Sequence, residues 1–252
     1  MDTTPPPLRR CNGECATDHD FAIAMAFQPV VDLTERRIYA YEALVRGVNG
    51  ESAASVLAQV TEENRYSFDQ ACRVKAISTA ARLGLDRRLN INFMPNAVYH
   101  PEACLRVTLK AAREHGFPSN LITFEFTEDE QVLDRGHLKS IVETYRQHGF
   151  KTALDDFGAG FAGLSLLADF QTDIIKLDRC LVDGIDTSKP RQAIVAGLIK
   201  TAQMLDLAVV AEGVERAEEL AVLKEMGIRY YQGYLFARPA LETLTSEAQI
   251  GL

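Results

Sequence analysis

The segment Lys151–Gly163, KTALDDFGAGFAG, carries the main features from which the fold of this 252-residue chain is predicted. Its apolar run Thr152–Leu154 is typical of a short strand buried in a parallel sheet. Asp155 and Asp156 follow directly, and a glycine-rich loop comes next. Adjacent carboxylates at the end of a buried strand repel each other unless a cation lies between them. The segment alone leaves two interpretations open: a divalent-metal site, or a turn that caps the next helix.

Strands and helices alternate on both sides of this segment. The predicted strands are Met25–Leu33, Arg37–Val45, Leu89–Phe93, Leu121–Phe126, Lys151–Leu154, Asp173–Leu177, Leu207–Ala211 and Tyr230–Phe236. The predicted helices cover residues 52–60, 67–83, 101–115, 136–148, 164–168, 190–205 and 217–226. This alternation predicts an α/β fold, and the length favours a TIM-like (β/α)8 barrel over an open sheet. The first two strands have no helix between them, so one antiparallel strand near the start is expected.

Composition and charge exclude several classes of protein. With 47% hydrophobic residues the chain can bury a large core, and its net charge of −8 disfavours binding to DNA or RNA. Apolar runs fall short of the roughly 20 residues that span a bilayer, so no membrane insertion is expected. The N-terminus lacks an apolar signal core, which predicts a cytoplasmic protein.

The first 20 residues are predicted to form a flexible tail, because three consecutive prolines from Pro5 preclude a helix there. The ordered domain then covers residues 21–252. Cys11, Cys15 and His19 could supply metal ligands, although a fourth is not evident, and the simpler interpretation is a tail with incidental thiols. The remaining cysteines, Cys72, Cys104 and Cys180, are predicted to be buried thiols.

Polar side chains occur at or just beyond the carboxyl end of nearly every predicted strand. They are Glu42, Arg46, Asn92, Glu125, Glu128, Asp155, Asp156, Lys176, Asp178, Glu212, Glu215 and Gln232. In a parallel barrel these ends face one cavity, so we expect most of the set to converge. Each residue taken singly could be a helix cap, a surface acid or a satisfied core amide.

Carboxylates with an amide oxygen, and no His or Cys cluster, suit Mg²⁺ or Mn²⁺ better than Zn²⁺. The adjacent aspartates could serve two ions, which together activate a water and stabilise phosphoryl oxygens. Lys176 would be protonated among acids, whereas nearby cations and desolvation favour its neutral form, which could orient or deprotonate the water. Arg46 offers a phosphate clamp.

In this order, the motifs resemble those of the EAL domain family of cyclic di-GMP phosphodiesterases. The resemblance covers about Met25 to Pro239. It comprises FQPVVDL from Phe27, EAL from Glu42 with Arg46, NFMP from Asn92, EFTE from Glu125, DDFGAG from Asp155, KLD from Lys176, AEGVE from Ala211 and QGYLFARP from Gln232.

The resemblance implies a barrel that uses Mg²⁺ or Mn²⁺, as two ions, to hydrolyse cyclic di-GMP to linear pGpG. It assigns metal ligation to Glu42, Asn92, Glu125, Asp155 and Asp156, and catalysis to Lys176, Glu212 and Gln232. It implies substrate contacts for Gln28, Arg46 and Asp69, and supporting roles for Glu128, which would anchor the loop, Asp178 and Glu215.

One loop departs from the family pattern: this chain has FGAGFAGL from Phe157 where many members have FGTGYSSL. The family often dimerises near this loop, so a homodimer is implied. Two alternatives to the enzyme stay open. One is a catalytically silent cyclic di-GMP receptor or interaction module, and the other is a metal-dependent barrel enzyme acting on another anionic substrate.

Overall fold

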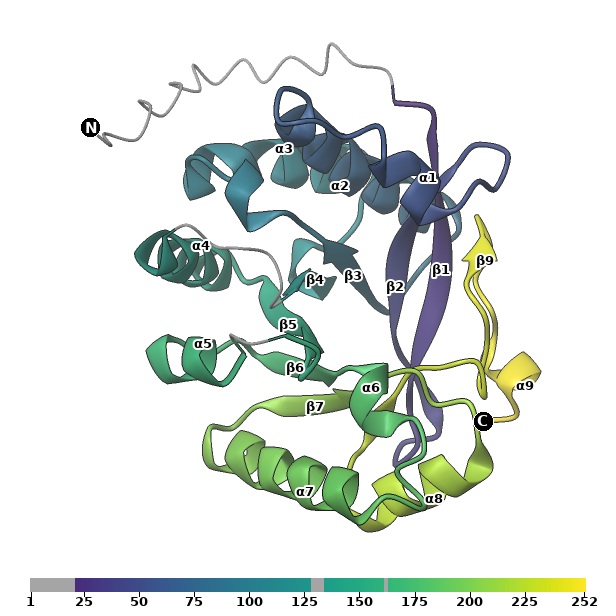
Figure 1. Cartoon of the computed structure of the whole chain (residues 1–252). Helices are drawn as coiled ribbons and strands as arrows, with labels where there is room; N and C mark the ends of the chain where they lie inside the picture. Colours follow the sequence, from purple (N-terminus) through teal and green to yellow (C-terminus); the bar gives the residue numbers. More distant parts are fainter. Residues whose placement is uncertain (1–20, 128–133, 161–162) are drawn as a thin grey trace.

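A closed β-barrel stands at the centre of the molecule, and helices surround it (Figure 1). The computed structural model describes residues 21–127, 134–160 and 163–252. The predicted tail with Cys11, Cys15 and His19 lies outside the described residues, as do Glu128 and two positions of the variant loop, 161 and 162.

The barrel strands follow one another in sequence order around the ring. They are β1 (Ile23–Asp32), β2 (Arg37–Gly47), β3 (Arg88–Asn92), β4 (Ile122–Thr127), β5 (Lys151–Phe157), β6 (Ile174–Leu177), β7 (Ala208–Ala211) and β8 (Tyr230–Tyr231). Neighbours from β2 to β8 pair in parallel, whereas β1 runs antiparallel to both β2 and β8 and closes the ring. An added strand, β9 (Ala240–Leu241), pairs with β1 outside the ring. The predicted barrel with one antiparallel strand is confirmed.

Helices connect the parallel strands and cover the outside of the barrel (Figure 1). They are α1 (Ala53–Leu57), α2 (Arg65–Arg82), α3 (Pro101–Glu114), α4 (Arg135–Gln147), α5 (Gly163–Asp169), α6 (Arg179–Val182), α7 (Lys189–Met204), α8 (Ala217–Glu225) and α9 (Glu247–Ile250), with 3₁₀ turns at Pro95–Ala97 and Ser119–Leu121. None of the helices in the described ranges is long and apolar enough to cross a membrane.

Two hydrophobic cores result from the alternation of side chains along the strands. The larger core lies between the sheet and the helices. A smaller cluster consists of Val30, Ala40, Ala153, Ile174 and Val210, which we call the inner core. Further along the same strands, two residues past an inner-core member, stand Glu42, Asp155, Lys176 and Glu212. The inner core therefore forms an apolar floor beneath the polar side chains at the mouth.

The opposite end of the barrel is fastened by an ion pair. The carboxylate of Asp32, at the end of β1, is fully buried and accepts two hydrogen bonds from Arg229 Nε and one from Nη2. The backbone N–H groups of Thr34 and Glu35 donate to the same carboxylate. This one side chain thus joins the turn after β1 to the residue that precedes β8.

Some local predictions were wrong. The extended segment expected at Tyr230–Phe236 ends as β8 at Tyr231, because the chain turns at Gly233 against Val214. The strand β9 and the short helices α6 and α9 were not predicted. Cys180, expected to be buried, is exposed, since it lies on the single turn of α6 rather than inside a periodic helix.

Candidate active site

Lys176 stands at the centre of the polar residues that the barrel gathers at its mouth. Its ammonium group lies 3.3 Å from a carboxylate oxygen of Glu42, 3.0 Å from Glu125, 2.9 Å from Asp155 and 2.7 Å from Glu212. Three of these acids belong to β2, β4 and β5, and Glu212 directly follows β7. The structure therefore brings together residues that lie far apart in the sequence, on or directly after five different strands.

Side-chain amides fix the orientation of Glu42. Asn92 Nδ2 donates to Glu42 Oε1 at 2.8 Å, and Gln232 Nε2 donates to Glu42 Oε2 at 2.8 Å. Gln232 Nε2 also donates to Gln28 Oε1 at 3.2 Å, while Gln28 Nε2 donates to the carbonyl of Ala237. Gln28 was predicted as a substrate contact; here both ends of its amide are engaged within the protein, and it supports Gln232.

Asn90 is a residue of the site that the sequence analysis missed. Its Nδ2 donates to Glu125 Oε1 at 2.7 Å, and both side chains are buried. The sequence does contain a signal for Asn90: it lies two residues before Asn92, and side chains two residues apart on a strand share one face.

Asp156 reaches the site through a backbone irregularity. Strand alternation would place it on the opposite face from Asp155, but the pairing of β5 with β6 shifts register after Leu154, and Asp156 takes φ = 52°. Its carboxylate then lies in one group with Asp155 and Glu212. Asp156 is thus a non-glycine residue with a left-handed backbone conformation, and this conformation brings its carboxylate to the centre.

The electrostatics of this centre show an excess of negative charge. Burial opposes the charge on Lys176, but the four surrounding carboxylates outweigh it and hold its pKa well above the usual value. Burial and the neighbouring acids raise the pKa of Glu125 and of Glu212. Burial, with the charges of Asp155 and Asp178, raises the pKa of Asp156 to about 6. One ammonium group cannot balance all these acids, so further positive charge would be bound favourably.

The donor set fits a divalent-metal centre. Two groups of carboxylates each offer oxygens within 4.8 Å of one another: Glu42, Glu125 and Asp155, and then Asp155, Asp156 and Glu212. Asp155 belongs to both groups, as a residue that bridges two ions would. Gln232 Oε1 is buried and finds no hydrogen-bond partner in the part of the chain that is described. Oxygen donors of this kind suit Mg²⁺ or Mn²⁺.

Two other predicted residues, Asp178 and Glu215, lie at the rim. Asp178 caps α6 by accepting from the backbone N–H of Cys180 at 2.8 Å. Glu215 forms an ion pair with Arg179 at 3.0 Å, and its backbone N–H donates to Glu219.

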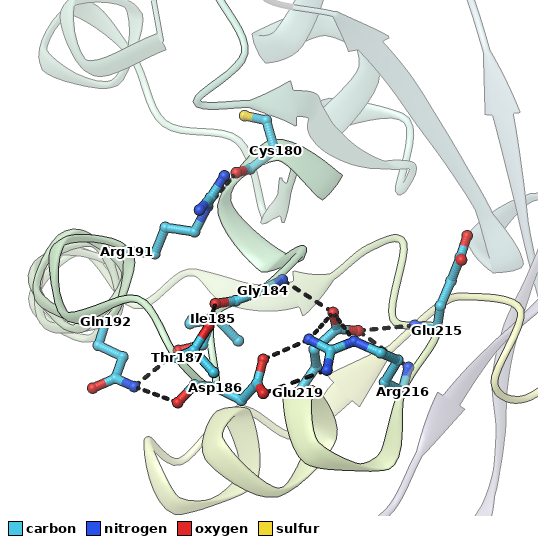
Figure 2. A network of polar contacts seen from close by, with 10 residues as sticks. All are labelled: Cys180, Gly184, Ile185, Asp186, Thr187, Arg191, Gln192, Glu215, Arg216 and Glu219. Atoms are coloured by element: carbon cyan, nitrogen blue, oxygen red, sulfur yellow. Dashed lines mark hydrogen bonds and ion pairs between the residues drawn. The ribbon is translucent and has the colours of Figure 1, made fainter.

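Figure 2 shows how this rim is held. The carboxylate of Glu219 accepts from the backbone N–H groups of Gly184, Glu215 and Arg216, and the Arg216 side chain pairs with Asp186. The loop after β7, which begins with Glu212, is therefore tied to the loop after α6.

A cavity of about 540 Å³ adjoins the acidic centre, and its walls are mainly apolar. Asn92, Leu44 and Thr127 line both this cavity and the acidic pocket. Asp69 also lines the cavity, but its carboxylate is buried and pairs with Arg73 Nε at 2.7 Å. It accepts a further hydrogen bond from the backbone N–H of Met94.

Asp69 and Arg46, two of the predicted substrate contacts, differ in burial and in their partners. Asp69 is already bonded within the protein, which leaves it less free to bind a ligand. Arg46, by contrast, is half-buried, and its guanidinium donates to the carbonyl of Val45.

Fold and site together define a (β/α)8-type barrel with a cluster of carboxylates that could hold a divalent metal ion, at the carboxyl ends of its parallel strands. A family model described as "EAL domain" matches residues 17–239, and the chain belongs to the EAL domain family.

Similar proteins are known in sequence and in structure. The chain is 33% identical to the blue light- and temperature-regulated antirepressor BluF of Escherichia coli, over 93% of this chain and 58% of that protein. It is 29% identical to the cyclic di-GMP phosphodiesterase NbdA of Pseudomonas aeruginosa, over 87% of this chain and 29% of that protein. The chain spans 28% to 58% of the length of the first three curated relatives.

Among solved structures, a standalone versatile EAL protein from Vibrio cholerae O395, in its c-di-GMP-bound form, is 53% identical with a TM-score of 0.88. That match covers 90% of this chain and 96% of the other. The manganese and cyclic di-GMP complex of Klebsiella pneumoniae BlrP1 is 37% identical with a TM-score of 0.83, over 88% of this chain and 57% of that one.

Proposed function

We propose that this protein is a metal-dependent phosphodiesterase that hydrolyses cyclic di-GMP to linear pGpG. The observation that carries the proposal is the convergence of Glu42, Glu125, Asp155 and Glu212 on Lys176 at the mouth of the barrel. The names of the relatives support it, since NbdA is named a cyclic di-GMP phosphodiesterase and the Vibrio and Klebsiella structures are named as cyclic di-GMP complexes.

Hydrolysis here means attack of a water oxygen on one phosphorus and breakage of its P–O3′ bond. The proton lost by the water balances the proton gained by the 3′ oxygen, so the ring opens to a linear dinucleotide with one 5′ phosphate. Two bound ions would supply Lewis acidity for the phosphate oxygens and lower the pKa of the attacking water.

The site residues have two proposed roles: some bind the metal ions, and others orient or activate the attacking water. In this proposal Glu42, Asn92, Glu125 and Asp155 hold one ion, and Asp155 and Asp156 hold the second. Bound cations would share the carboxylates around Lys176 and weaken their hold on its proton, so that Lys176 could orient or deprotonate the water. Glu212 and Gln232 fix the water from the neighbouring strands, and the unpartnered Gln232 Oε1 can accept its hydrogen bond.

Substrate recognition would use the rim and the apolar cavity. The cavity is lined by Leu44, Phe68 and Phe93, and these apolar side chains suit a purine base. Asp69 borders this cavity, and Gln28 borders the acidic pocket. Arg46 would clamp a phosphate of the same molecule.

The test is chromatographic. The protein is incubated with cyclic di-GMP and Mn²⁺ or Mg²⁺ beside Glu42→Gln, and beside Lys200→Met as a control on the exposed side of α7. We expect pGpG from the wild type and from Lys200→Met, and a rate lowered at least ~10-fold in Glu42→Gln, since even residues that only support a metal ligand change affinity or activity about 10- to 100-fold. Intact cyclic di-GMP with the wild type would contradict the proposal.

A second candidate is a cyclic di-GMP receptor or interaction module without turnover. The observation that favours it is that the Escherichia coli relative is named an antirepressor and not an enzyme. Tight binding of cyclic di-GMP with no pGpG in either metal would establish this candidate. We further propose, from the family resemblance, that the protein forms a homodimer, which light scattering of the purified chain tests directly.

A further inference from the structure

We propose that Asn90 is a positioning residue that sets the carboxylate of Glu125 for metal binding. This inference rests on the proposed metal-dependent function and deepens it. Asn90 lies on β3, opposite Glu42 of β2 and Thr123 of β4 in the pairing of the strands. It therefore stands between the two strands that carry Glu42 and Glu125.

The two oxygens of Glu125 have different partners. Asn90 Nδ2 donates to Oε1 at 2.7 Å, and Lys176 Nζ donates to Oε2 at 3.0 Å. Glu125 is fully buried and Asn90 is 3% exposed, so bulk water cannot replace either contact. The amide thus holds one oxygen to the barrel wall while the other faces the centre, where Lys176 lies.

An amide suits this task because it is neutral. A cationic donor in its place would repel a bound metal ion, and an apolar side chain would leave Oε1 without a donor in a buried site. If the oxygen that faces Lys176 is to hold a metal ion, the hydrogen bond from Asn90 would keep the carboxylate from rotating. Residues that orient metal ligands in this way typically change metal affinity about 10- to 100-fold when they are replaced.

The two ends of the Asn90 amide differ in their contacts. Its Oδ1 is buried and has no hydrogen-bond partner in the described part of the chain, which costs stability. Its Nδ2 donates to Glu125. The contact with Glu125 is therefore the one that accounts for an asparagine at this position.

The test is Mn²⁺ binding to metal-stripped protein, with free Mn²⁺ followed by electron paramagnetic resonance. We expect Asn90→Leu to raise the Kd for Mn²⁺ about 10- to 100-fold. Asn90→Ser, which keeps a hydrogen-bond donor on a shorter side chain, should give a smaller increase in the Kd for Mn²⁺. It replaces Asn90→Leu as the test variant if that protein does not fold. Thr108→Val is the matched control, since Thr108 is equally buried, has an unpartnered oxygen and lies on α3, outside the barrel.

The melting temperature of the metal-free protein distinguishes an effect of Asn90 on metal binding from an effect on folding. We expect Asn90→Leu to lower it, because Glu125 Oε1 loses its donor, and Thr108→Val to leave it nearly unchanged, because that hydroxyl has no partner in the described residues. The Kd for Mn²⁺ should change only in the Asn90 variants. An unchanged Kd in Asn90→Leu, or a loss of affinity shared with Thr108→Val, would overturn the inference. Mn²⁺ binding by the wild type without hydrolysis would overturn the proposed function alone, and absence of Mn²⁺ binding would overturn both.

Discussion

The ammonium group of Lys176 and the carboxylate of Glu212 lie 2.7 Å apart, although the two residues are 36 positions apart in the chain. They meet because β6 and β7 pair in parallel, with Lys176 opposite Val210. Their side chains point into the barrel above the inner core, where water has little access. The electrostatic character of the site follows from this pairing, since a single cation is shared among several buried acids.

Removal of that cation should make folding dependent on metal. Lys176→Met leaves the acids without a positive partner, and breaking a buried ion pair in this way typically costs about 3–5 kcal/mol. We expect a large fall in the melting temperature of the metal-free variant and substantial recovery on addition of Mn²⁺. Differential scanning calorimetry with and without MnCl₂ measures both, and Lys200→Met should behave as the wild type. Recovery of hydrolysis along with stability would show that Lys176 only balances charge.

The stability of the metal-free protein should depend on the ionisation of Asp156. Its pKa is about 6 in the fold, above the ordinary value of 3.8, so the folded state holds this proton more tightly than the unfolded chain does. The cost of ionising Asp156 in the fold is therefore absent below about pH 4 and complete above about pH 6.

Asp156→Asn removes that cost and tolerates the left-handed backbone at this position. We expect it to stabilise the metal-free protein by about 1–2 kcal/mol at pH 8, after allowance for solvent screening of this half-buried group. The gain should vanish near pH 4. Urea unfolding at the two pH values checks this, and an equal gain at both would contradict the assignment of the effect to the charge.

The Asp32–Arg229 ion pair should affect stability but not the site. Burial opposes the charge on Asp32, but Arg229 and the N–H groups of Glu35 and Thr34 outweigh it and lower the pKa. The contribution of this carboxylate is therefore present above its unfolded pKa and lost as the pH falls through the lower folded value. We expect Asp32→Asn to cost about 1–3 kcal/mol at pH 7, and the cost should decrease as the pH falls through the lowered pKa of Asp32. Chemical unfolding measures the cost, and Mn²⁺ binding should be unchanged.

Gly233 permits a close approach that positions Gln232. A side chain at Gly233 would collide with the backbone of Val214, whose N–H donates to the carbonyl of Gln232. We expect Gly233→Ala to lower stability by about 1–3 kcal/mol through overpacking. Displacement of Gln232 from Glu42 by about 1 Å should lower activity about 100-fold.

The control for this substitution is Gly197→Ala on α7, where a methyl group meets nothing within 4 Å. It should raise stability by about 0.5–1 kcal/mol. Equal effects of the two substitutions in unfolding and turnover assays would exclude the close contact as the cause.

The barrel could be predicted because each of its parts has a local signal. Short apolar strands alternate with helices that stop at glycines such as Gly84 and Gly149, both with positive φ in the structure. The convergence of Glu42, Glu125 and Lys176 then follows from the parallel order of the strands. Short elements such as α6 and β9 carry too few residues for a periodic pattern, and they form through contacts made by the rest of the fold.

Contacts between distant side chains were harder to predict. Adjacent residues such as Asp155 and Asp156 point to opposite faces of a regular strand, and only the irregularity in β5 brings both to the centre. The hydrogen bond that Gln232 donates to Gln28 links the residue after the last strand of the ring to the first strand, and it depends on the closure of the barrel. Strand periodicity could have identified Asn90, but its partner on β4 is visible only in three dimensions.

The antiparallel direction of β1 also decides where the chain enters the domain. Because β1 runs from the mouth towards the floor, Ile23 pairs with Gly47 at the end of β2 that carries Arg46. In a barrel of parallel strands alone, the first residue would enter at the far end. A sensor or tether joined before Phe21 would here be attached on the mouth side of the barrel, and β1 would connect that junction directly to Gln28, which borders the acidic pocket.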